Sequence, residues 1–348
     1  MQLIRSDLPP QGWDDWLVEA GLESGFCQTT AMAHSHSLLH GSRPVYLIVE
    51  EDGEWLAGAQ ILNMPVNPKR PDAGIRMFCD EGPVLHGDTK ALGIILNGII
   101  DIARAENTES LRIYPPVLAH WINDESNESL LAACACNHWQ TSVVDISTDE
   151  DTLFSSLERS IKKSIRKCRK LGITVHSCQS VDEFVTSFLN PYTSANGQVL
   201  DATKLQGYRA WWTVVNQSGY LFLYARDPQG RVLATLGSIG FAGMATEIMS
   251  ARTPESYSIN ASPQDLLHWE SFCHHARMKQ RYFNLAGFSP SPMSDKEQGI
   301  RRYKEKWPGR VLDYPLYTWQ PRSLRKKLAG IIQPARDRLY ALWPGKPD

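Results

Sequence analysis

The sequence contains no long apolar run. Its longest such stretch covers 91–102 and is interrupted by Gly93, Asn97, Gly98 and Asp101, whereas a membrane-spanning helix needs about 20 predominantly apolar residues. The first residues, MQLIRSDLPPQGW, also lack the charged-then-apolar order of a secretory signal peptide. We therefore predict a cytoplasmic protein without a transmembrane span.

Paired cysteines and metal-binding patterns are missing as well. The seven cysteines are an odd number, and Cys134-x-Cys136 has no second pair at zinc-ligand spacing. Free thiols in a reducing compartment are the better interpretation. His36 and His40 share a helix face, but no carboxylate at ligand spacing accompanies them. We predict that the protein has no metal site.

Charge of one sign is not in excess. The formal net charge is −2, with 21% charged and 42% hydrophobic residues, which is ordinary for a globular protein. This balance argues against coating of the whole surface by nucleic acid, but it permits a local basic patch. With 348 residues the chain is long for one domain, and we expect two.

The order of predicted elements repeats along the chain. Each half reads as a strand, two helices, a three-stranded meander, a helix, a strand, a helix and a closing strand, which predicts an α/β (α+β) fold with mixed sheets flanked by helices. We place the domains at 1–148 and 149–320, followed by a basic tail at 321–348. A single helix over 151–171 is expected to join the halves, and another over 129–136 to precede the first closing strand.

The stretch 260–309 has the clearest local signals. Ser262 as N-cap and Pro263 at the first helical position begin a helix with one apolar face. A short strand over 282–286 and a second helix over 295–306 follow. The second helix ends in a cationic cluster of Arg301, Arg302, Lys304 and Lys306. Such a cluster, close to a strand end, is suited to hold phosphate groups or a developing oxyanion.

Four segments carry a family signature. GFCQT at 25–29, DEGPV at 80–84 and the basic LERSIKKSIRKCRKLGITV at 157–175 are followed by LHWE, YFNLAG and YKEKWPG within 267–309. In this order they resemble the FLQS segment, the PRGPV segment, the basic helix before a glycine and a strand, and the LxWE…FDLGG…FKxxFG pattern of the FemABX family. That family comprises peptidoglycan-bridge aminoacyltransferases, which are relatives of the Gcn5-related N-acetyltransferases (GNAT).

The chain departs from these motifs at three positions: Glu81 replaces an arginine, Asn284 an aspartate and Ala286 a glycine. The resemblance spans 26–317 and implies two packed GNAT-like domains that move an activated acyl or aminoacyl group to an amine. It implies no bound cofactor, a donor that is either aminoacyl-tRNA or acyl-coenzyme A, and an acceptor amine on a sugar or peptide of a cell-envelope or polysaccharide precursor. It also favours a monomer.

The sequence leaves the donor open. The usual coenzyme A signature of GNAT enzymes, Arg/Gln-x-x-Gly-x-Gly/Ala, is missing from the corresponding segments 82–88 and 259–263. This disfavours ordinary coenzyme A binding, and a coenzyme A-dependent N-acetyltransferase stays as the alternative function. A non-catalytic module that binds RNA or anionic lipid is the third hypothesis.

The resemblance implies a catalytic role for Lys304. The family's Phe-Lys pair corresponds to Tyr303-Lys304, where the lysine can stabilise the oxyanion of a tetrahedral intermediate. A solvated lysine on a basic helix is the competing interpretation. Glu247 lies in the strand before the helix at Pro263, where Gcn5-like enzymes often keep a general base. An outward-facing strand glutamate is the competing interpretation there.

Further candidates are proposed to bind substrate, because they are cationic or lie at the start of a helix. They are Arg301, Arg302 and Lys306 near Lys304, Lys162, Lys163 and Arg166 on the basic helix, and Asn260 and Ser262 before the helix at Pro263. Ordinary solvated charge is the competing interpretation. The tail mixes basic and apolar residues, so we also expect that it could rest on the inner face of a membrane.

Overall fold

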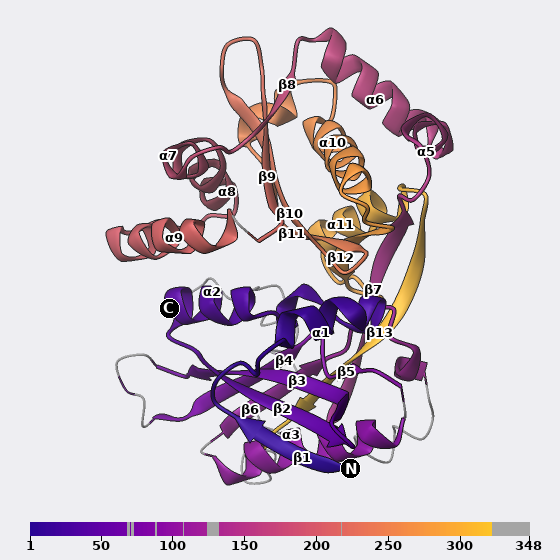
Figure 1. Ribbon diagram of the computed structural model, residues 1–348. Helices are drawn as coiled ribbons and strands as arrows, with labels where there is room; N and C mark the ends of the chain where they lie inside the picture. Colours follow the sequence, from indigo (N-terminus) through magenta and orange to yellow (C-terminus); the bar gives the residue numbers. More distant parts are fainter. Residues whose placement is uncertain are drawn as a thin grey trace.

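The computed structural model divides into two lobes. It describes residues 1–67, 70, 73–87, 89–106, 108–123, 132–216 and 218–321. The predicted basic tail lies outside these residues, apart from Pro321. In Figure 1 the N-terminal lobe lies below and the C-terminal lobe above, and two long strands, β7 (Ala135–Asp145) and β13 (Gly309–Trp319), run between them.

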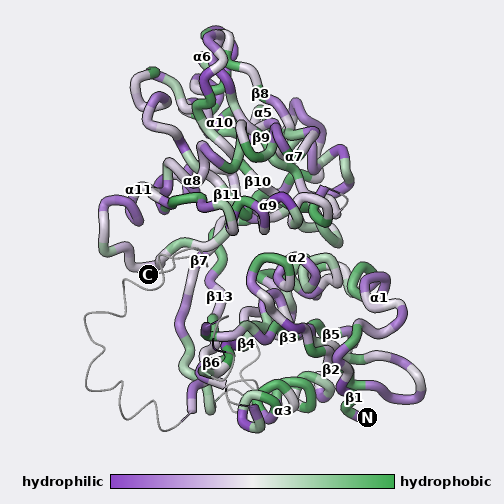
Figure 2. The backbone as a smooth tube through the Cα atoms, turned by 90° about the vertical axis from the view of Figure 1, so that its left-hand side faces the viewer, coloured by the Kyte–Doolittle hydropathy of each residue, from purple (hydrophilic) through white to green (hydrophobic). Residues whose placement is uncertain are grey.

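The N-terminal lobe is a sheet covered by helices. Its elements are β1 (Gln2–Ser6), α1 (Trp13–Glu19), α2 (Thr30–His40), β2 (Arg43–Glu51), β3 (Glu54–Pro65), β4 (Ile75–Asp80), β5 (Val84–Leu85), α3 (Lys90–Ala105) and β6 (Thr108–Tyr114). Ile95, Leu96 and Ile99 of α3 are fully buried in the core of this lobe. Figure 2 shows α3 as a mostly hydrophobic helix below the strands, as its apolar periodicity predicts.

The C-terminal lobe repeats this plan with more helices. Its elements are α5 (Glu150–Ser156), α6 (Arg159–Lys170), β8 (Thr174–Ser177), α7 (Val181–Glu183), a π-helix (Phe184–Leu189), α8 (Asn190–Ala195), α9 (Ala202–Val215), β9 (Tyr220–Arg226), β10 (Val232–Phe241), β11 (Met244–Arg252), α10 (Pro263–Arg277), β12 (Tyr282–Phe288) and α11 (Asp295–Glu305). The predicted mixed sheet flanked by helices is therefore confirmed. In the described part of the chain, no helix is long and apolar enough to span a membrane.

The two halves exchange their closing strands. Along the sheet the order is β1-β2-β3-β4-β6-β13-β7-β12-β11-β10-β9-β8, so the described strands form one continuous sheet. β13, from the end of the chain, pairs with β6 (Tyr317↔Ile113), and β7 pairs with β12 (Asp145↔Tyr282). The strands β13 and β7 pair with each other from Gly309↔Val144 to Thr318↔Ala135.

This exchange places residues of each half in the core of the other. Trp319 of β13 is buried in the N-terminal core, and Val144 of β7 is buried in the C-terminal core. Neither lobe therefore completes its core from its own half of the chain. The sequence order had suggested that each half closes its own sheet. That the two domains divide at residue 148 stays a prediction.

The predicted single helix over 151–171 is wrong, because α5 and α6 are separate. Leu157 and Glu158 between them have extended backbone, each with ψ of 148°. Leu153 and Leu157 are both buried in the C-terminal core, so the break turns both leucines into the same core. The apolar face predicted for this region is nevertheless confirmed, since Ile161 is fully buried with them.

The helix predicted over 129–136 is also wrong where the structure describes it. Ala135 and Cys136 are the first residues of β7, and 129–131 lie outside the described residues. β13 pairs with both of these residues. A long-range partner strand therefore overrides the local helical pattern here.

His275 in the C-terminal lobe predicts a loss of stability in acid. Burial, together with the charge of His274, lowers the pKa of His275 to about 3, and its Nε2 lies 2.9 Å from Ser238 Oγ. Unfolding returns this group to an ordinary pKa near 6.5, so its effect is absent above that pH and grows as the pH falls towards 3. At pH 5 it reduces the free energy of unfolding by about 2 kcal/mol.

Urea unfolding at pH 7 and pH 5 measures this difference. His275→Gln removes the titrating group and keeps a polar side chain for Ser238. We expect the variant to lose less stability than the wild type between the two pH values. Equal losses in both proteins would show that His275 is not the group responsible.

Candidate active site

The site lies where two parallel strands of the C-terminal lobe diverge. β11 and β12 pair over three positions, from Met244↔Tyr282 to Thr246↔Asn284. In the N-terminal lobe the corresponding strands β4 and β6 stay paired from Ile75↔Thr108 to Asp80↔Tyr114. Beyond Thr246 and Asn284, the backbone N–H and C=O groups of β11 and β12 no longer bond to each other and need other partners. Only the C-terminal lobe has such an opening between its parallel strands in the part that the structure describes.

A distortion of β12 at this opening presents two carbonyl groups. The pairing of β12 with β7 shifts between Asn284 and Gly287, and Ala286 has a left-handed backbone with φ of 63°. The Ala286 N–H donates to Asn284 Oδ1 at 2.9 Å, which holds the turn. The family glycine at the position of Ala286 is explained by this φ, because glycine adopts it without strain.

Lys304 of α11 donates to both carbonyl groups. Its Nζ lies 3.2 Å from the oxygen of Ala286 and 3.1 Å from that of Gly287. The side chain is only 8% exposed, so it is not a solvated surface lysine. Burial lowers the pKa of Lys304, while the carboxylate of Glu247 acts in the opposite direction. The sequence thus positions a buried cation at the point where the strands diverge.

Glu247 of β11 faces inward and binds a histidine. It is 9% exposed, and its Oε2 lies 3.0 Å from Nε2 of the fully buried His268 of α10. Ser250 Oγ donates to the other carboxylate oxygen. Burial would raise the pKa of Glu247, but the contacts with His268, Lys304 and Ser250 lower it to about 2. The competing interpretation, that Glu247 faces outward from its strand, is therefore wrong.

His268 links Glu247 to Tyr303. Its Nδ1 lies 2.9 Å from the Tyr303 hydroxyl and 2.9 Å from the carbonyl oxygen of Gln264. Because an ionised carboxylate only accepts hydrogen bonds, the Nε2 facing Glu247 carries a proton. Nδ1 then accepts from Tyr303 when the imidazole is neutral and donates to Gln264 when it is charged. Contacts on both ring nitrogens thus fix the orientation of the imidazole.

No local pattern in the sequence indicates the role of His268. It lies within the LHWE segment that was matched to the family, but a buried histidine in an apolar helix has many purely structural uses. Its partner Glu247 is 21 residues away in another element. Only the packing of α10 on β11 brings the two together.

The start of α10 is already occupied by protein groups. Lys306 Nζ lies 2.6 Å from Oδ1 of Asp265 and 4.1 Å from the centre of the Tyr303 ring. Ser262 Oγ donates to the same Asp265 oxygen, and the Ser262 N–H donates to Ser164 Oγ of α6 at 3.0 Å. A carboxylate in the first turn offsets the positive potential that would attract a phosphate to this helix end.

The remaining candidates near Lys304 lie at the surface. Arg301 pairs with Glu305 at 2.7 Å and donates to the Pro290 carbonyl, and the exposed Arg302 donates to a carbonyl of its own helix. Asn260 is exposed. The structure thus brings Lys304, Tyr303 and Glu247 together, and it leaves Arg302 and Asn260 outside this cluster.

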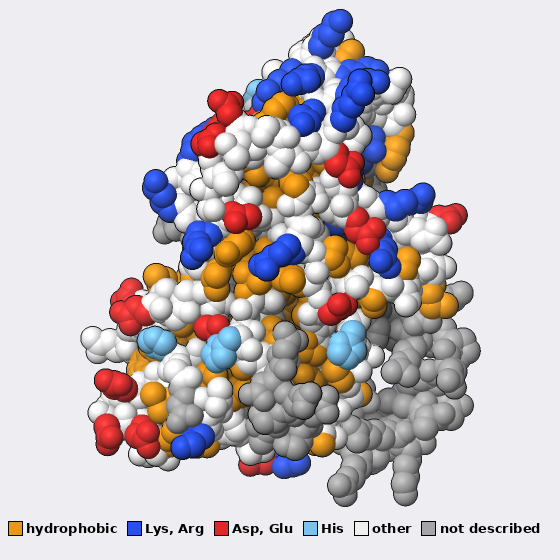
Figure 3. Space-filling view, turned by 90° about the vertical axis from the view of Figure 1, so that its right-hand side faces the viewer, with side chains coloured by type: hydrophobic (Ala, Val, Ile, Leu, Met, Phe, Trp, Pro, Cys, Tyr) orange, Lys and Arg blue, Asp and Glu red, His pale blue; other side chains and the backbone are white. Residues whose placement is uncertain are grey.

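The basic helix α6 packs on α10 and presents its cations to solvent. Ile161, Ile165 and Cys168 are buried, whereas Lys163 and Arg166 are exposed. Lys162 Nζ donates to the Ser155 carbonyl, and the guanidinium of Arg166 lies 5.5 Å from the centre of the Phe154 ring. Figure 3 shows lysine and arginine side chains gathered at the top of the molecule, where α6 lies in Figure 1.

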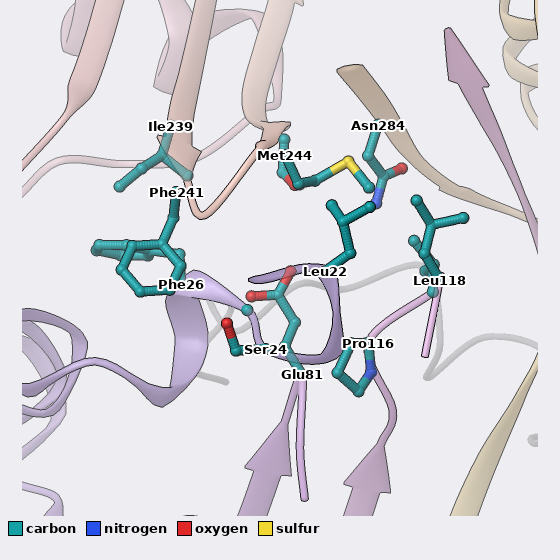
Figure 4. A pocket seen from close by; sticks show the side chains of 13 residues that line it. Leu22, Ser24, Phe26, Glu81, Pro116, Leu118, Ile239, Phe241, Met244 and Asn284 are labelled. Atoms are coloured by element: carbon teal, nitrogen blue, oxygen red, sulfur yellow. The ribbon is translucent and has the colours of Figure 1, made fainter. Parts of the chain in front are cut away.

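A pocket that is partly open to solvent lies between the lobes (Figure 4). The N-terminal lobe contributes Phe26 and Glu81, and the C-terminal lobe contributes Phe241, Thr246 and Asn284. Thr246 and Asn284 are the last pair before β11 and β12 diverge. The pocket therefore reaches the strand opening at which Lys304 is held.

Metal chemistry has no support in the geometry. No group of three or more His, Cys, Asp or Glu side chains in the described part of the chain is arranged to hold a metal ion. His36 and His40 contact each other with ring centres 5.2 Å apart. That the protein uses no metal stays a prediction.

Comparison with solved structures defines the class of fold, that of tandem GNAT proteins. FemX aligns with a TM-score of 0.73 and 14% identity, over 94% of this chain and 99% of that chain. L-PGS from Bacillus licheniformis aligns at 0.56 and 12% identity, over 93% and 96%. A tandem GNAT protein from the clavulanic acid biosynthesis pathway aligns at 0.55 and 12% identity, over 92% and 98%.

No protein-family model and no curated protein matches the sequence. At the identities of the solved structures, the likeness shows the fold. The chain has the two-lobed GNAT-type fold of FemX, so the resemblance seen in the sequence motifs is confirmed at the level of fold.

Proposed function

We propose that the protein transfers an activated acyl or aminoacyl group to an amine, with the reaction in the C-terminal lobe. The observation that carries this proposal is the buried ammonium of Lys304, fixed by two carbonyl oxygens where β11 and β12 diverge. A fixed cation in a site with little water stabilises developing negative charge without reorganisation. Acyl transfer develops such charge on the carbonyl oxygen of the donor.

The chemistry proceeds through a tetrahedral intermediate. The amine nitrogen bonds to the carbonyl carbon of the donor, and an electron pair moves onto the carbonyl oxygen, which receives a hydrogen bond from Lys304. Collapse of this intermediate breaks the bond between the carbon and the oxygen or sulfur of the carrier. The carrier leaves as an alcohol or thiol with one proton from the amine, and the product is an amide.

Glu247 acts through His268 in this proposal. A carboxylate with a pKa of about 2 is a weak base on its own. Held against His268, it fixes the imidazole with Nε2 protonated, so that Nδ1 can accept from Tyr303. Glu247 and His268 thus hold Tyr303 and the helix turn that carries Lys304 in position.

Aminoacyl-tRNA is the donor that we favour over acyl-coenzyme A. The Ser262 N–H already donates to Ser164, and the Asp265 carboxylate places negative charge at the helix start where a diphosphate would bind. Within the described ranges, α6 carries six cations without a carboxylate partner: Arg159, Lys162, Lys163, Arg166, Lys167 and Lys170. Polyanions bind such surfaces through release of counterions. The acceptor proposed is an amine of a cell-envelope or polysaccharide precursor, and the monomeric state and membrane contact stay predictions.

Calorimetry with separate donors tests this assignment. The purified protein is titrated with acetyl-coenzyme A, with aminoacylated tRNA and with uncharged tRNA. We expect tRNA to bind, with a preference for the aminoacylated form. Micromolar binding of acetyl-coenzyme A alone would instead support the alternative N-acetyltransferase. Binding of RNA without preference and without transfer would support the non-catalytic module.

Charge reversal on α6 is expected to weaken tRNA binding. Lys163→Glu combined with Lys170→Glu replaces two exposed cations on the helix that packs on α10. We expect at least a tenfold weaker affinity at low salt and a shallower dependence of affinity on salt, by roughly one to two in the slope. Lys296→Glu combined with Lys279→Glu is the matched control in exposed positions elsewhere. Equal effects of both pairs would show that binding is not centred on α6.

A further inference from the structure

The pocket between the lobes has one charged group, and most of the other side chains that line it are apolar. Leu22, Phe26, Pro116 and Phe241 supply apolar surface, and Glu81 supplies a carboxylate. Figure 4 shows the Glu81 carboxylate among Leu22, Ser24 and Phe26, directed towards the side chains of the other lobe. Among the described residues that line it, none is a lysine or an arginine.

The position of the Glu81 side chain is fixed by its surroundings. Its backbone is left-handed, with φ of 51°, which is strained for a residue other than glycine. Oε2 accepts from the Cys27 N–H at 2.8 Å. A Cβ at Gly25 would lie 2.3 Å from the Glu81 Cβ, so the missing side chain there makes room for the glutamate. Several features thus hold one carboxylate at the pocket.

The neighbouring charges do not neutralise Glu81. Asp80 accepts from Arg112 at 3.1 and 2.6 Å through both carboxylate oxygens, so this arginine is already paired. Burial raises the pKa of Glu81, and the hydrogen bonds from Cys27 oppose this shift. The resemblance would place an arginine at this position. The chain therefore has a negative charge where the family pattern has a positive one.

We propose that this pocket binds the acceptor as a primary ammonium group on an apolar chain, with Glu81 as its ion partner. The inference rests on the proposed function, since it assigns the amine of that reaction. The pocket holds a single carboxylate among aliphatic and aromatic side chains, so it suits the amine-bearing end of a substrate. Phe26 and Phe241, with ring centres 6.2 Å apart, offer the apolar and aromatic contacts that such a group prefers.

The pocket leads to the reacting centre through β12. Asn284 lines the pocket and accepts a hydrogen bond from the Ala286 N–H. The carbonyl of Ala286 in turn accepts from Lys304. Asn284 and Ala286 thus connect the pocket that holds Glu81 with the ammonium of Lys304.

The three protons of the ammonium group are all accounted for. One passes to the Glu81 carboxylate, and the uncharged amine attacks the acyl carbon. A second leaves with the carrier when the bond from carbon to oxygen or sulfur breaks. The third stays on the amide nitrogen, and Glu81 releases its proton to solvent with the product.

Binding of simple amines without any donor tests this inference. Calorimetry compares Nα-acetyl-lysine methylamide, its uncharged analogue Nα-acetyl-norleucine methylamide, and glucosamine. We expect the lysine amide to bind and the norleucine amide to bind at least tenfold more weakly. Binding of glucosamine in preference to the lysine amide would assign the ammonium to an amino sugar. Equal binding of the lysine and norleucine amides, or binding of no amine at millimolar concentration, would overturn the proposal.

Glu81→Gln is the decisive variant. Its amide oxygen can still accept from the Cys27 N–H, so the fold should be retained, which thermal unfolding verifies. We expect at least a tenfold loss of lysine amide affinity. Glu19→Gln, an exposed position on α1, is the matched control. Unchanged affinity in Glu81→Gln would overturn the proposal.

Because no donor is present, these binding results do not depend on acyl transfer. Amine binding that requires Glu81, in a protein that transfers no acyl group, would leave the pocket assignment intact and refute the proposed function. Acyl transfer that proceeds equally well in Glu81→Gln would support the proposed function and refute the assignment of the pocket.

Discussion

Replacement of Lys304 by methionine is expected to slow acyl transfer by about 10²–10³-fold, which corresponds to 2.7–4 kcal/mol of transition-state stabilisation. Methionine keeps the length and the apolar stem of the side chain but removes the ammonium that lies 3.2 and 3.1 Å from two carbonyl oxygens. The loss should fall on the rate of the chemical step, because the charge on the donor oxygen appears only in the intermediate. Single-turnover kinetics with saturating donor measures this rate.

The control for Lys304→Met is Lys296→Met, an exposed lysine on the same helix. It should leave the rate unchanged. Donor affinity measured by calorimetry should stay within about threefold of wild type in both variants, because uniform binding does not depend on the oxyanion contact. A Lys304→Met rate within threefold of wild type would contradict the proposed role of this lysine.

Replacement of His268 by leucine is expected to lower the free energy of unfolding by about 3–5 kcal/mol. His268 is fully buried, and its Nε2 hydrogen-bonds the ionised carboxylate of Glu247 at 3.0 Å. Removal of one partner of a buried pair leaves an uncompensated charge in the protein interior. Urea unfolding at pH 7 measures the loss.

A second substitution separates this charge effect from packing. Glu247→Met in the His268→Leu background removes the unpaired carboxylate, and we expect the double variant to regain more than half of the lost stability. Ser250 then loses its acceptor, but it lies at the edge of the cluster. A double variant less stable than His268→Leu alone would show that the leucine itself, and not the charge, is responsible.

Elements with strong local signals could be predicted from the sequence. The helix at Thr30–His40 and the strand at Tyr220–Arg226 have the bounds that their patterns predict. Thr29 accepts from the Met32 N–H at the start of α2, and Gly41 ends it with φ of 64°. Both devices act over a few residues, so they are visible in the sequence.

The exchange of closing strands could not be predicted in this way. Polar and apolar residues alternate along β7 and β13 as in other strands, and nothing in Ala135–Asp145 specifies β12 as a partner. Pairing between distant strands depends on packing of whole lobes, for which short-range patterns carry no information. The break between α5 and α6 at Leu157 also depends on long-range packing, because burial of Leu153 and Leu157 in one core overrides helical periodicity.

The candidate site was predictable where a motif supplied it and not elsewhere. The resemblance pointed to Lys304, and the structure shows that this lysine is buried. The roles of His268 and Glu81 could be recognised only from the fold, because their neighbours come from other elements. The replacement of a family glycine by Ala286 has a local explanation only once its φ of 63° is known.

One measurement tests most directly whether the protein is an acyltransferase. Purified protein is incubated with Nα-acetyl-lysine methylamide and either aminoacyl-tRNA or acetyl-coenzyme A, and mass spectrometry follows formation of the amide. We predict amide formation with aminoacyl-tRNA that depends on Lys304. Absence of amide with both donors, for an acceptor that calorimetry shows to bind, would contradict the proposed function.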